Sequence, residues 1–146
     1  MTAYVDTSIL AAYYCPEPLS SAAEHALRNL SSPMISDLTL VEFASAISRK
    51  VREKTFSRES AVQLMTQFEP HLAEGYYKVL ALKARDYHLA HSWLGQLTGT
   101  LRTLDALHLA VAQTAEISIL TADRRLAAEA RRLGVSVRLL TTRRME

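Results

Sequence analysis

The sequence predicts an α/β domain in which a parallel sheet of about five strands lies between layers of helices. Short apolar segments rich in strand-forming residues alternate with longer segments whose apolar residues recur at helical spacing. The chain has 146 residues, the size of one ordinary domain, and we find no internal repeat, low-complexity run or interdomain linker. We therefore expect residues 1–146 to form a single domain.

The composition is that of an ordinary soluble protein, with 49% apolar residues, 22% charged residues and a net charge of +2. Its one cysteine, Cys15, excludes an internal disulfide and suits a reducing compartment. We see no signal segment and no apolar run of the roughly 18 residues that a membrane span needs. We therefore expect a cytoplasmic protein with no membrane partner. Arginines crowd the last quarter of the chain, where they can bind phosphates or simply form solvated helix faces.

The first predicted element is a strand at Tyr4–Val5, because both residues favour extended structure. A helix then runs to about Tyr14, with Thr7 or Ser8 as its cap. The prolines of Cys15–Pro18 end this helix, since proline cannot continue a helical hydrogen-bond pattern.

The next pair of elements is a helix from Ser20 or Ser21 to about Asn29 and a candidate strand at Met34–Ile35. Ser36–Asp37 then opens the clearest helix of the first half, which runs to about Lys54. Five of its apolar residues follow helical spacing: Leu40, Val41, Ala44, Ile47 and Val51.

The middle of the chain contains a helix over Ser60–Leu72, which we expect to be interrupted or bent at Pro70. Tyr76–Leu80 is rich in strand formers. A helix over about Lys83–Leu94 follows, and a glycine-containing loop covers Gly95–Thr100.

The last part begins with a strongly apolar helix over Leu101–Ala115 and the clearest strand, Ile117–Thr121. Ala122–Asp123 leads into a helix that Gly134 ends, as glycine often does. Val135–Leu139 is the last strand, and we expect the final residues to be frayed.

Four acidic residues occupy similar places in this pattern: Asp6, Glu42, Asp105 and Asp123. Asp6 and Asp123 each follow an apolar strand directly. In a parallel sheet such strand ends lie at one edge, together with the N-termini of the helices that follow. Glu42 and Asp105 lie near helix starts of this kind, so all four carboxylates can face a single cleft.

Each acid also has a structural interpretation when taken alone. Asp6 and Asp123 can cap helices, Glu42 can complete a capping box with Thr39, and Asp105 can stabilise a helix dipole. Together, however, carboxylates about 4 Å apart repel by roughly 4 kcal/mol per pair at an effective dielectric near 20. Such a cluster needs protons or a cation, and oxygen-only ligands select Mg²⁺ or Mn²⁺.

Other common kinds of site find less support in the sequence. The histidines have no spacing that suggests zinc, and the chain has neither a glycine-rich phosphate loop nor a Gly-x-Ser-x-Gly elbow. Cys15 has no obvious base beside it. His108 follows Asp105 by one helical turn, so it either lies near the cleft or is a core residue.

Four short motifs, in this order and spacing, resemble the PIN-domain ribonucleases: Val5–Ser8, Leu38–Glu42, Leu101–Ala110 and Leu120–Leu126. The likeness covers nearly the whole chain and is closer to the VapC-type toxins of bacterial and archaeal toxin–antitoxin pairs. It implies the strand order 3-2-1-4-5 and a site made of the four acids, with Thr7, Ser8 and Thr121 as supporting polar residues. Asp86 matches no motif of the family, and we leave it outside the site.

The resemblance also implies an activity and partners. The activity would be endoribonuclease cleavage that depends on Mg²⁺ or Mn²⁺, with metal-activated water attacking phosphorus. Asp6 and Asp123 would be the first metal ligands, with Glu42 and Asp105 binding directly, through water, or orienting the nucleophile. The partners would be RNA, held by basic residues at the cleft, a VapB-type antitoxin, and a second copy of the chain in a homodimer.

Three other functions are compatible with parts of the sequence. A PIN nuclease could act in RNA processing outside toxin–antitoxin pairs, and a catalytically silent PIN fold could serve as an interaction protein. A receiver-like phosphoacceptor would want paired acids after the first strand and an aspartate after a middle strand. Here Asp6 stands alone, and Met34–Ile35 and Tyr76–Leu80 end without an aspartate.

Overall fold

The predicted parallel sheet is present in the computed structural model, which describes residues 1–142. All four strand pairings are parallel, and the strand order is β3-β2-β1-β4-β5. The strands are β1 (Thr2–Val5), β2 (Ser32–Ser36), β3 (Lys78–Leu80), β4 (Ile119–Thr121) and β5 (Val137–Leu139). Both the fold class and the strand order expected from the sequence are therefore confirmed.

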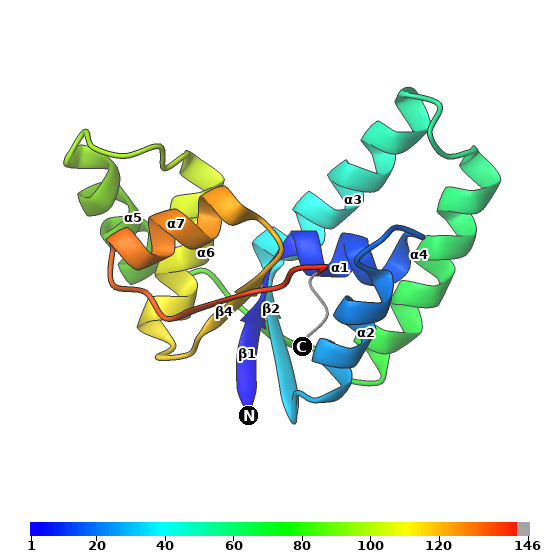
Figure 1. Cartoon of the computed structure of the whole chain (residues 1–146), viewed down its shortest axis with the longest axis horizontal. Coiled ribbons are helices and arrows are strands. Elements are labelled where there is room, and N and C mark those ends of the chain that lie inside the picture. Colours follow the sequence, from blue (N-terminus) through cyan, green and yellow to red (C-terminus); the bar gives the residue numbers. More distant parts are fainter. Residues whose placement is uncertain (143–146) are drawn as a thin grey trace.

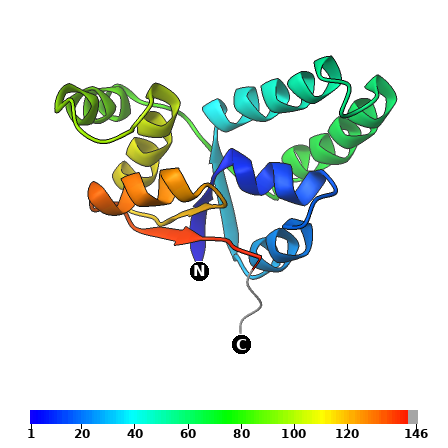
Figure 2. The same ribbon diagram turned by 45° about the horizontal axis from the view of Figure 1, so that its top comes forward.

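Helices lie on both sides of the sheet. They are α1 (Thr7–Tyr14), α2 (Ser20–Arg28), α3 (Asp37–Arg52), α4 (Arg58–Ala73), α5 (Ala84–Gly95), α6 (Thr103–Thr114) and α7 (Arg124–Arg132). In Figures 1 and 2, α1 to α4 gather on one side of the strands and α5 to α7 on the other. The long helices α3 and α4 lie side by side and project beyond the sheet (Figure 1).

Two hydrophobic cores follow from the alternation of side chains along the strands. Val5 and Leu120 belong to the core formed with α1 to α4, whereas their neighbours Tyr4 and Ile119 belong to the core formed with α5 to α7. All four side chains are buried. The central strands β1 and β4 are thus covered on both faces, as parallel strands usually are.

Some boundaries differ from those predicted. The last three strands begin later than expected, so Tyr76, Ile117 and Val135 lie outside them, because a strand forms only where a neighbour pairs with it. Pro70 does not interrupt α4, which continues to Ala73. Since Pro70 lies in the last turn, its missing N–H leaves only one carbonyl near the helix end without its usual donor. The expected fraying concerns the last residues, which lie outside the described range.

The strand order places β1 at the centre of the sheet, with β2 on one side and β4 on the other. The chain leaves β1 at Asp6, β2 at Ser36 and β4 toward Asp123, all at the same edge of the sheet. The direction of winding reverses between β1 and β4, and open α/β sheets bind ligands at such a point. No helix within residues 1–142 has the length and apolar character that crossing a bilayer requires.

Candidate active site

Asp6 lies at the centre of the sheet edge and is only 7% exposed. Its Oδ2 atom accepts hydrogen bonds from Ser8 Oγ (2.7 Å) and Thr121 Oγ1 (2.8 Å). Asp6 occupies the N-cap position of α1, yet its side chain makes no capping hydrogen bond. The other oxygen, Oδ1, accepts no hydrogen bond from residues 1–142. The helix-cap interpretation of Asp6 is therefore wrong, and one of its oxygens remains available to a ligand.

The two hydroxyl residues after Asp6 do not cap α1 either. Thr7 donates to Glu42 Oε1 (2.8 Å), and Ser8 donates to Asp6 while its Oγ accepts from the Ala122 N–H (2.9 Å). Both hydroxyls thus hold the predicted site acids or the backbone beside them. Thr7 and Ser8 therefore lie beside the predicted acids, and their expected capping role is wrong.

Thr121 joins the first acid to the last. Its Oγ1 donates to Asp6 and accepts from the backbone N–H of Asp123 (3.0 Å). Asp123 caps α7, because its Oδ1 accepts from the backbone N–H groups of Arg125 (2.9 Å) and Leu126 (3.2 Å). Within the described chain its Oδ2 accepts no hydrogen bond. Asp123 therefore fixes the start of α7 and still presents one oxygen to a ligand.

Glu42 lies in the second turn of α3, where its Oε1 accepts hydrogen bonds from Thr7 Oγ1 (2.8 Å) and from His108 Nε2. It does not complete a capping box, as the sequence had suggested, because α3 begins at Asp37 and the box is formed by Ser36 and Thr39. Burial raises the pKa of Glu42, but hydrogen bonds from His108 and Thr7 outweigh it and bring the pKa below its ordinary 4.5. Glu42 is therefore ionised at neutral pH.

His108 connects Glu42 to the interior of the sheet. Its side chain is 2% exposed, and its Nδ1 lies 2.5 Å from the hydroxyl of Tyr4. Desolvation raises the pKa of Tyr4, so this hydroxyl keeps its proton at neutral pH. On the other side of the ring, Nε2 donates to the ionised carboxylate of Glu42.

The Tyr4 hydroxyl is in turn held by the start of α3. It lies 2.7 Å from Ser36 Oγ and 3.2 Å from Thr39 Oγ1, the same two residues that form the capping box. All three side chains are buried. A continuous set of hydrogen bonds thus runs from this helix start through Tyr4 and His108 to Glu42, and it fixes the orientation of the glutamate.

Asp105 lies in the first turn of α6 and faces α7. Its Oδ2 is shielded from solvent and lies 2.8 Å from Arg125 Nη2. No donor among residues 1–142 is aligned well enough to make a hydrogen bond to this oxygen. The contact with Asp105 raises the pKa of the Arg125 guanidinium, which keeps its charge. A partly buried carboxylate needs a partner. For Asp105 this partner is the Arg125 guanidinium, which lies close to Oδ2 but is poorly aligned for a hydrogen bond.

Asp86, which the sequence left outside the site, has a structural role. It accepts from the Lys83 N–H (2.8 Å) and from the hydroxyl of Thr114, and so joins the start of α5 to the end of α6. Thr114 is nine residues after Asp105 on α6, which separates them by roughly 13 Å along the helix. Asp86 is thus remote from the other acids.

The acids fit a hard divalent cation in chemistry but do not enclose one. No group of three acidic, histidine or cysteine side chains within residues 1–142 is arranged to hold a metal ion. However, Asp6, Glu42 and Asp123 each keep one oxygen without a hydrogen bond from the described residues, and Asp105 Oδ2 is unsatisfied. Mg²⁺ commonly binds through one or two carboxylates and several waters, so this donor set fits such an ion without a complete protein cage.

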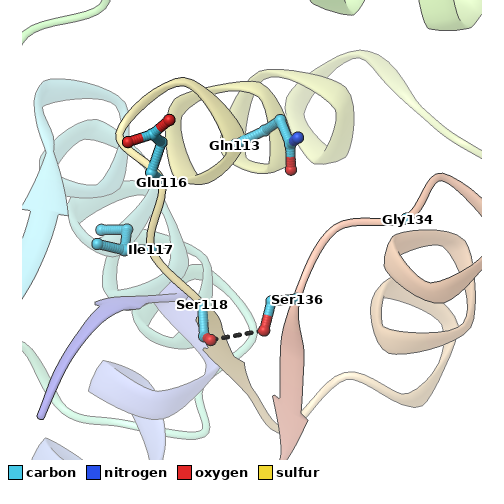
Figure 3. A pocket seen from close by; sticks show the side chains of 6 residues that line it. All are labelled: Gln113, Glu116, Ile117, Ser118, Gly134 and Ser136. Atoms are coloured by element: carbon cyan, nitrogen blue, oxygen red, sulfur yellow. Dashed lines mark hydrogen bonds between the residues drawn. The ribbon is translucent and has the colours of Figure 1, made fainter.

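A hollow of about 360 Å³ lies elsewhere, where β4 and β5 begin and α6 ends (Figure 3). Ser118 and Ser136 line it and their hydroxyls are 2.7 Å apart. This is the edge of the sheet opposite the four acids, and none of the acids lines the hollow. We do not assign it to the site.

Sequence reasoning missed the roles of two residues: Arg125 contacts Asp105, and Tyr4 contacts His108, which in turn contacts Glu42. Tyr4 was considered only as a strand former, and Arg125 only as one of several clustered arginines and as part of the motif Leu120–Leu126. The contact of Arg125 could have been anticipated from its place in the first turn of the helix after Asp123, because that turn lies at the same sheet edge as the acids. The bond between Tyr4 and His108 spans 104 positions and has no local signal.

The fold is similar to that of several solved structures. VapBC2 from Rickettsia felis bound to a promoter DNA fragment has a TM-score of 0.70 at 15% identity, covering 97% of this chain and 100% of that one. FitAcB from Neisseria gonorrhoeae has a TM-score of 0.74 at 15% identity, covering 97% and 98%. VapC20 from Mycobacterium tuberculosis, a toxin that cleaves the sarcin-ricin loop, has a TM-score of 0.69 at 19% identity, covering 88% and 95%.

At these identities the structural matches establish a shared fold. No curated protein matches the chain in sequence. The PIN domain model matches residues 3–132, a range that contains most of β1, all of β2 to β4 and all four acids. The chain therefore belongs to the PIN-domain family.

Proposed function

We propose that the protein is a Mg²⁺- or Mn²⁺-dependent endoribonuclease and the toxin of a VapBC-type toxin–antitoxin pair. The observation that carries the proposal is the arrangement of Asp6 and Asp123 on either side of the switch point. Each has one oxygen fixed by neighbouring donors and another oxygen without a donor among residues 1–142. Membership of the PIN-domain family supports nuclease chemistry at this place.

In this proposal the polar residues around the acids hold them ionised and oriented. Ser8 and Thr121 leave Asp6 Oδ1 to a ligand, and His108 and Thr7 leave Glu42 Oε2 to one. Asp6, Asp123, Asp105 and Glu42 would hold the cation, directly or through water. A divalent cation held there would activate water for attack on phosphorus near neutral pH and would offset charge on the phosphate.

The RNA backbone would be held by basic side chains near the acids. Arg102 immediately precedes α6 and Arg124 immediately follows Asp123, and both side chains are exposed. Arginine suits this task because its guanidinium is always charged and can donate two parallel hydrogen bonds to a phosphate.

The similar structures also suggest the partners that we propose for this chain. Similar structures are described as VapBC and FitAB complexes bound to DNA, and we propose a VapB-type antitoxin as the partner of this chain and the cytoplasm as its location.

We also propose a homodimer. Three exposed apolar side chains, Tyr87, Leu97 and Leu104, could contribute to its interface, and light scattering of the purified protein would measure the oligomeric state.

The function is tested by incubating the purified protein with total RNA in Mg²⁺, in Mn²⁺ and in EDTA. We expect discrete cleavage products that require the cation, and none with Asp6→Asn, which preserves shape and removes the charge. Circular dichroism of the variant checks that it remains folded. Cleavage that persists in Asp6→Asn would contradict the proposal, and a wild-type protein without cation-dependent cleavage would favour a silent PIN-fold interaction protein.

The toxin role is tested separately from the chemistry. Expression of the wild-type chain should arrest growth, Asp6→Asn should not, and co-expression of a cognate antitoxin encoded beside it should restore growth. Cation-dependent cleavage without growth arrest would instead favour a PIN nuclease that acts in RNA processing.

A further inference from the structure

Asp105 differs from the other three acids in the kind of partner it has. Within residues 1–142, Asp6 and Asp123 are held by hydroxyl and backbone donors, and Glu42 by a hydroxyl and an imidazole. Asp105 is the one of the four that contacts a guanidinium, that of Arg125, at 2.8 Å. A permanent positive charge therefore stands at Oδ2, one of the two carboxylate oxygens of Asp105.

Two further hydrogen bonds hold Arg125 beside Asp105, one from its guanidinium and one from its backbone. The second arm of the guanidinium, Nη1, donates to the backbone carbonyl of Thr100 at 3.0 Å, in the loop before α6. The backbone of Arg125 is fixed because its N–H donates to Asp123 Oδ1. Any rearrangement would thus be a rotation of the side chain, which is 36% exposed and has space toward solvent.

The loop does not depend on Arg125 alone. Glu129, one turn further along α7, accepts from both the N–H (3.0 Å) and the hydroxyl (3.1 Å) of Thr100. Arg132 donates to the Thr98 hydroxyl (3.2 Å). The Arg125 side chain can therefore leave its place while the loop before α6 stays attached to α7.

A guanidinium and a divalent cation cannot both contact Asp105 Oδ2 at low cost, because their charges repel at short range. We propose that Arg125 is a built-in counterion for Asp105 that a divalent cation must displace, so that this arginine lowers the affinity of the cleft for the cation. The inference rests on the proposed function, since it takes Asp105 as a cation ligand. It goes further in assigning to Arg125 a role opposed to metal binding.

The same contact stabilises the cation-free protein, because it neutralises one of four neighbouring carboxylates. The displaced guanidinium would remain beside the cleft, where a phosphate of the RNA backbone can accept its hydrogen bonds. Arg125 would thus contact the Asp105 carboxylate in the free protein and a phosphate in the RNA complex. Bound RNA would then raise the affinity for the cation, and the bound cation would raise the affinity for RNA.

The test is a titration of Mn²⁺ alone, with free Mn²⁺ measured by electron paramagnetic resonance. Arg125→Gln should bind Mn²⁺ about three- to fivefold more tightly than the wild type, the upper part of the effect expected of a partly exposed ion pair. The matched control is Arg124→Gln, which removes the same charge from the adjacent, exposed position of α7. Its Mn²⁺ affinity should change less than twofold.

A double-mutant cycle shows whether the effect acts through Asp105. In an Asp105→Asn background, Arg125→Gln should leave the Mn²⁺ affinity unchanged. Arg125→Lys keeps the charge but loses the planar fork, and we expect an affinity between those of the wild type and Arg125→Gln. Circular dichroism of each variant confirms the fold before titration.

Equal or weaker Mn²⁺ binding by Arg125→Gln would overturn the inference, as would equal tightening by Arg124→Gln, which would indicate a general charge effect. In either case a wild-type protein that still cleaves RNA with Mn²⁺ keeps the proposed function. If neither the wild type nor any variant binds Mn²⁺ or cleaves RNA, the proposed function itself fails.

Discussion

Thr121 Oγ1 donates a hydrogen bond to Asp6 Oδ2 across 2.8 Å, although the two residues are 115 positions apart in the chain. The same hydroxyl accepts from the backbone N–H of Asp123. One side chain at the end of β4 therefore orients the acid that follows β1 and also the start of α7. The two neighbouring strands at the switch point are joined through this hydroxyl.

We predict that Thr121→Val, which removes the hydroxyl at nearly constant volume, lowers cleavage by about 10- to 100-fold, as loss of a group that orients a metal ligand commonly does. It should also cost about 1–3 kcal/mol of stability, because the Asp123 N–H loses its acceptor. Urea unfolding and initial cleavage rates measure the two effects. Thr121→Ser keeps the hydroxyl and serves as the control, and equal activity of the Val and Ser variants would contradict the assigned role.

The hydrogen bond from His108 to Glu42 gives a second prediction. His108→Gln can keep an N–H donor near the position of Nε2, whereas His108→Leu removes it at similar size. We expect the Leu variant to bind Mn²⁺ about 10- to 100-fold more weakly and the Gln variant to lie close to the wild type. The same weakening in both variants would indicate that His108 only fills the core.

Tyr4→Phe tests the other end of this hydrogen-bond system. Removing the buried hydroxyl leaves His108 Nδ1 without its partner and takes one of its partners from the Ser36 hydroxyl, at a cost of about 1–3 kcal/mol in the free energy of unfolding. Mn²⁺ affinity should fall by a smaller factor than in His108→Leu, because the donor to Glu42 remains. A Mn²⁺ affinity lower than that of His108→Leu would show that Tyr4 acts on the acids by another route.

Glu129 gives a prediction about pH. Hydrogen bonds from Arg132 and Thr100 lower the pKa of Glu129 below its ordinary 4.5, against the opposing effect of burial. The stability it contributes is thus present above pH 4.5 and is lost as pH falls through the lower folded-state pKa. Glu129→Gln should lose about 1–3 kcal/mol at pH 7 and show a flatter dependence of stability on pH below about 4.5.

Urea unfolding over a series of pH values measures this effect. The control is Glu24→Gln, because Glu24 pairs with Arg28 at the surface and such pairs contribute about 0–1 kcal/mol. A Glu129→Gln curve parallel to that of the wild type would mean that Glu129 does not act through its charge.

The fold was predictable because its pattern is local. Alternating apolar strands and amphipathic helices specify a parallel sheet, and most of the apolar residues of α6 are buried in it. The positions of Asp6 and Asp123 were predictable for the same reason, since a residue that follows a parallel strand lies at a known edge.

The contacts of the acids were less accessible to sequence reasoning. The capping role given to Glu42 was wrong because it required α3 to begin near Thr39, whereas the helix begins at Asp37. The bonds from His108 to Tyr4 and from Arg125 to Asp105 join residues on different elements, and they depend on how those elements pack. The pairing of Arg125 with Asp105 also makes the acids less open to a cation than their sequence positions imply.

A divalent cation shared by these acids would be visible by anomalous diffraction from crystals grown with Mn²⁺. We expect an anomalous peak roughly 2.0–2.3 Å from carboxylate oxygens of Asp6 or Asp123, with Arg125 rotated away from Asp105. A cleft without an anomalous peak at saturating Mn²⁺, or a peak bound only by residues remote from Asp6 and Asp123, would contradict it.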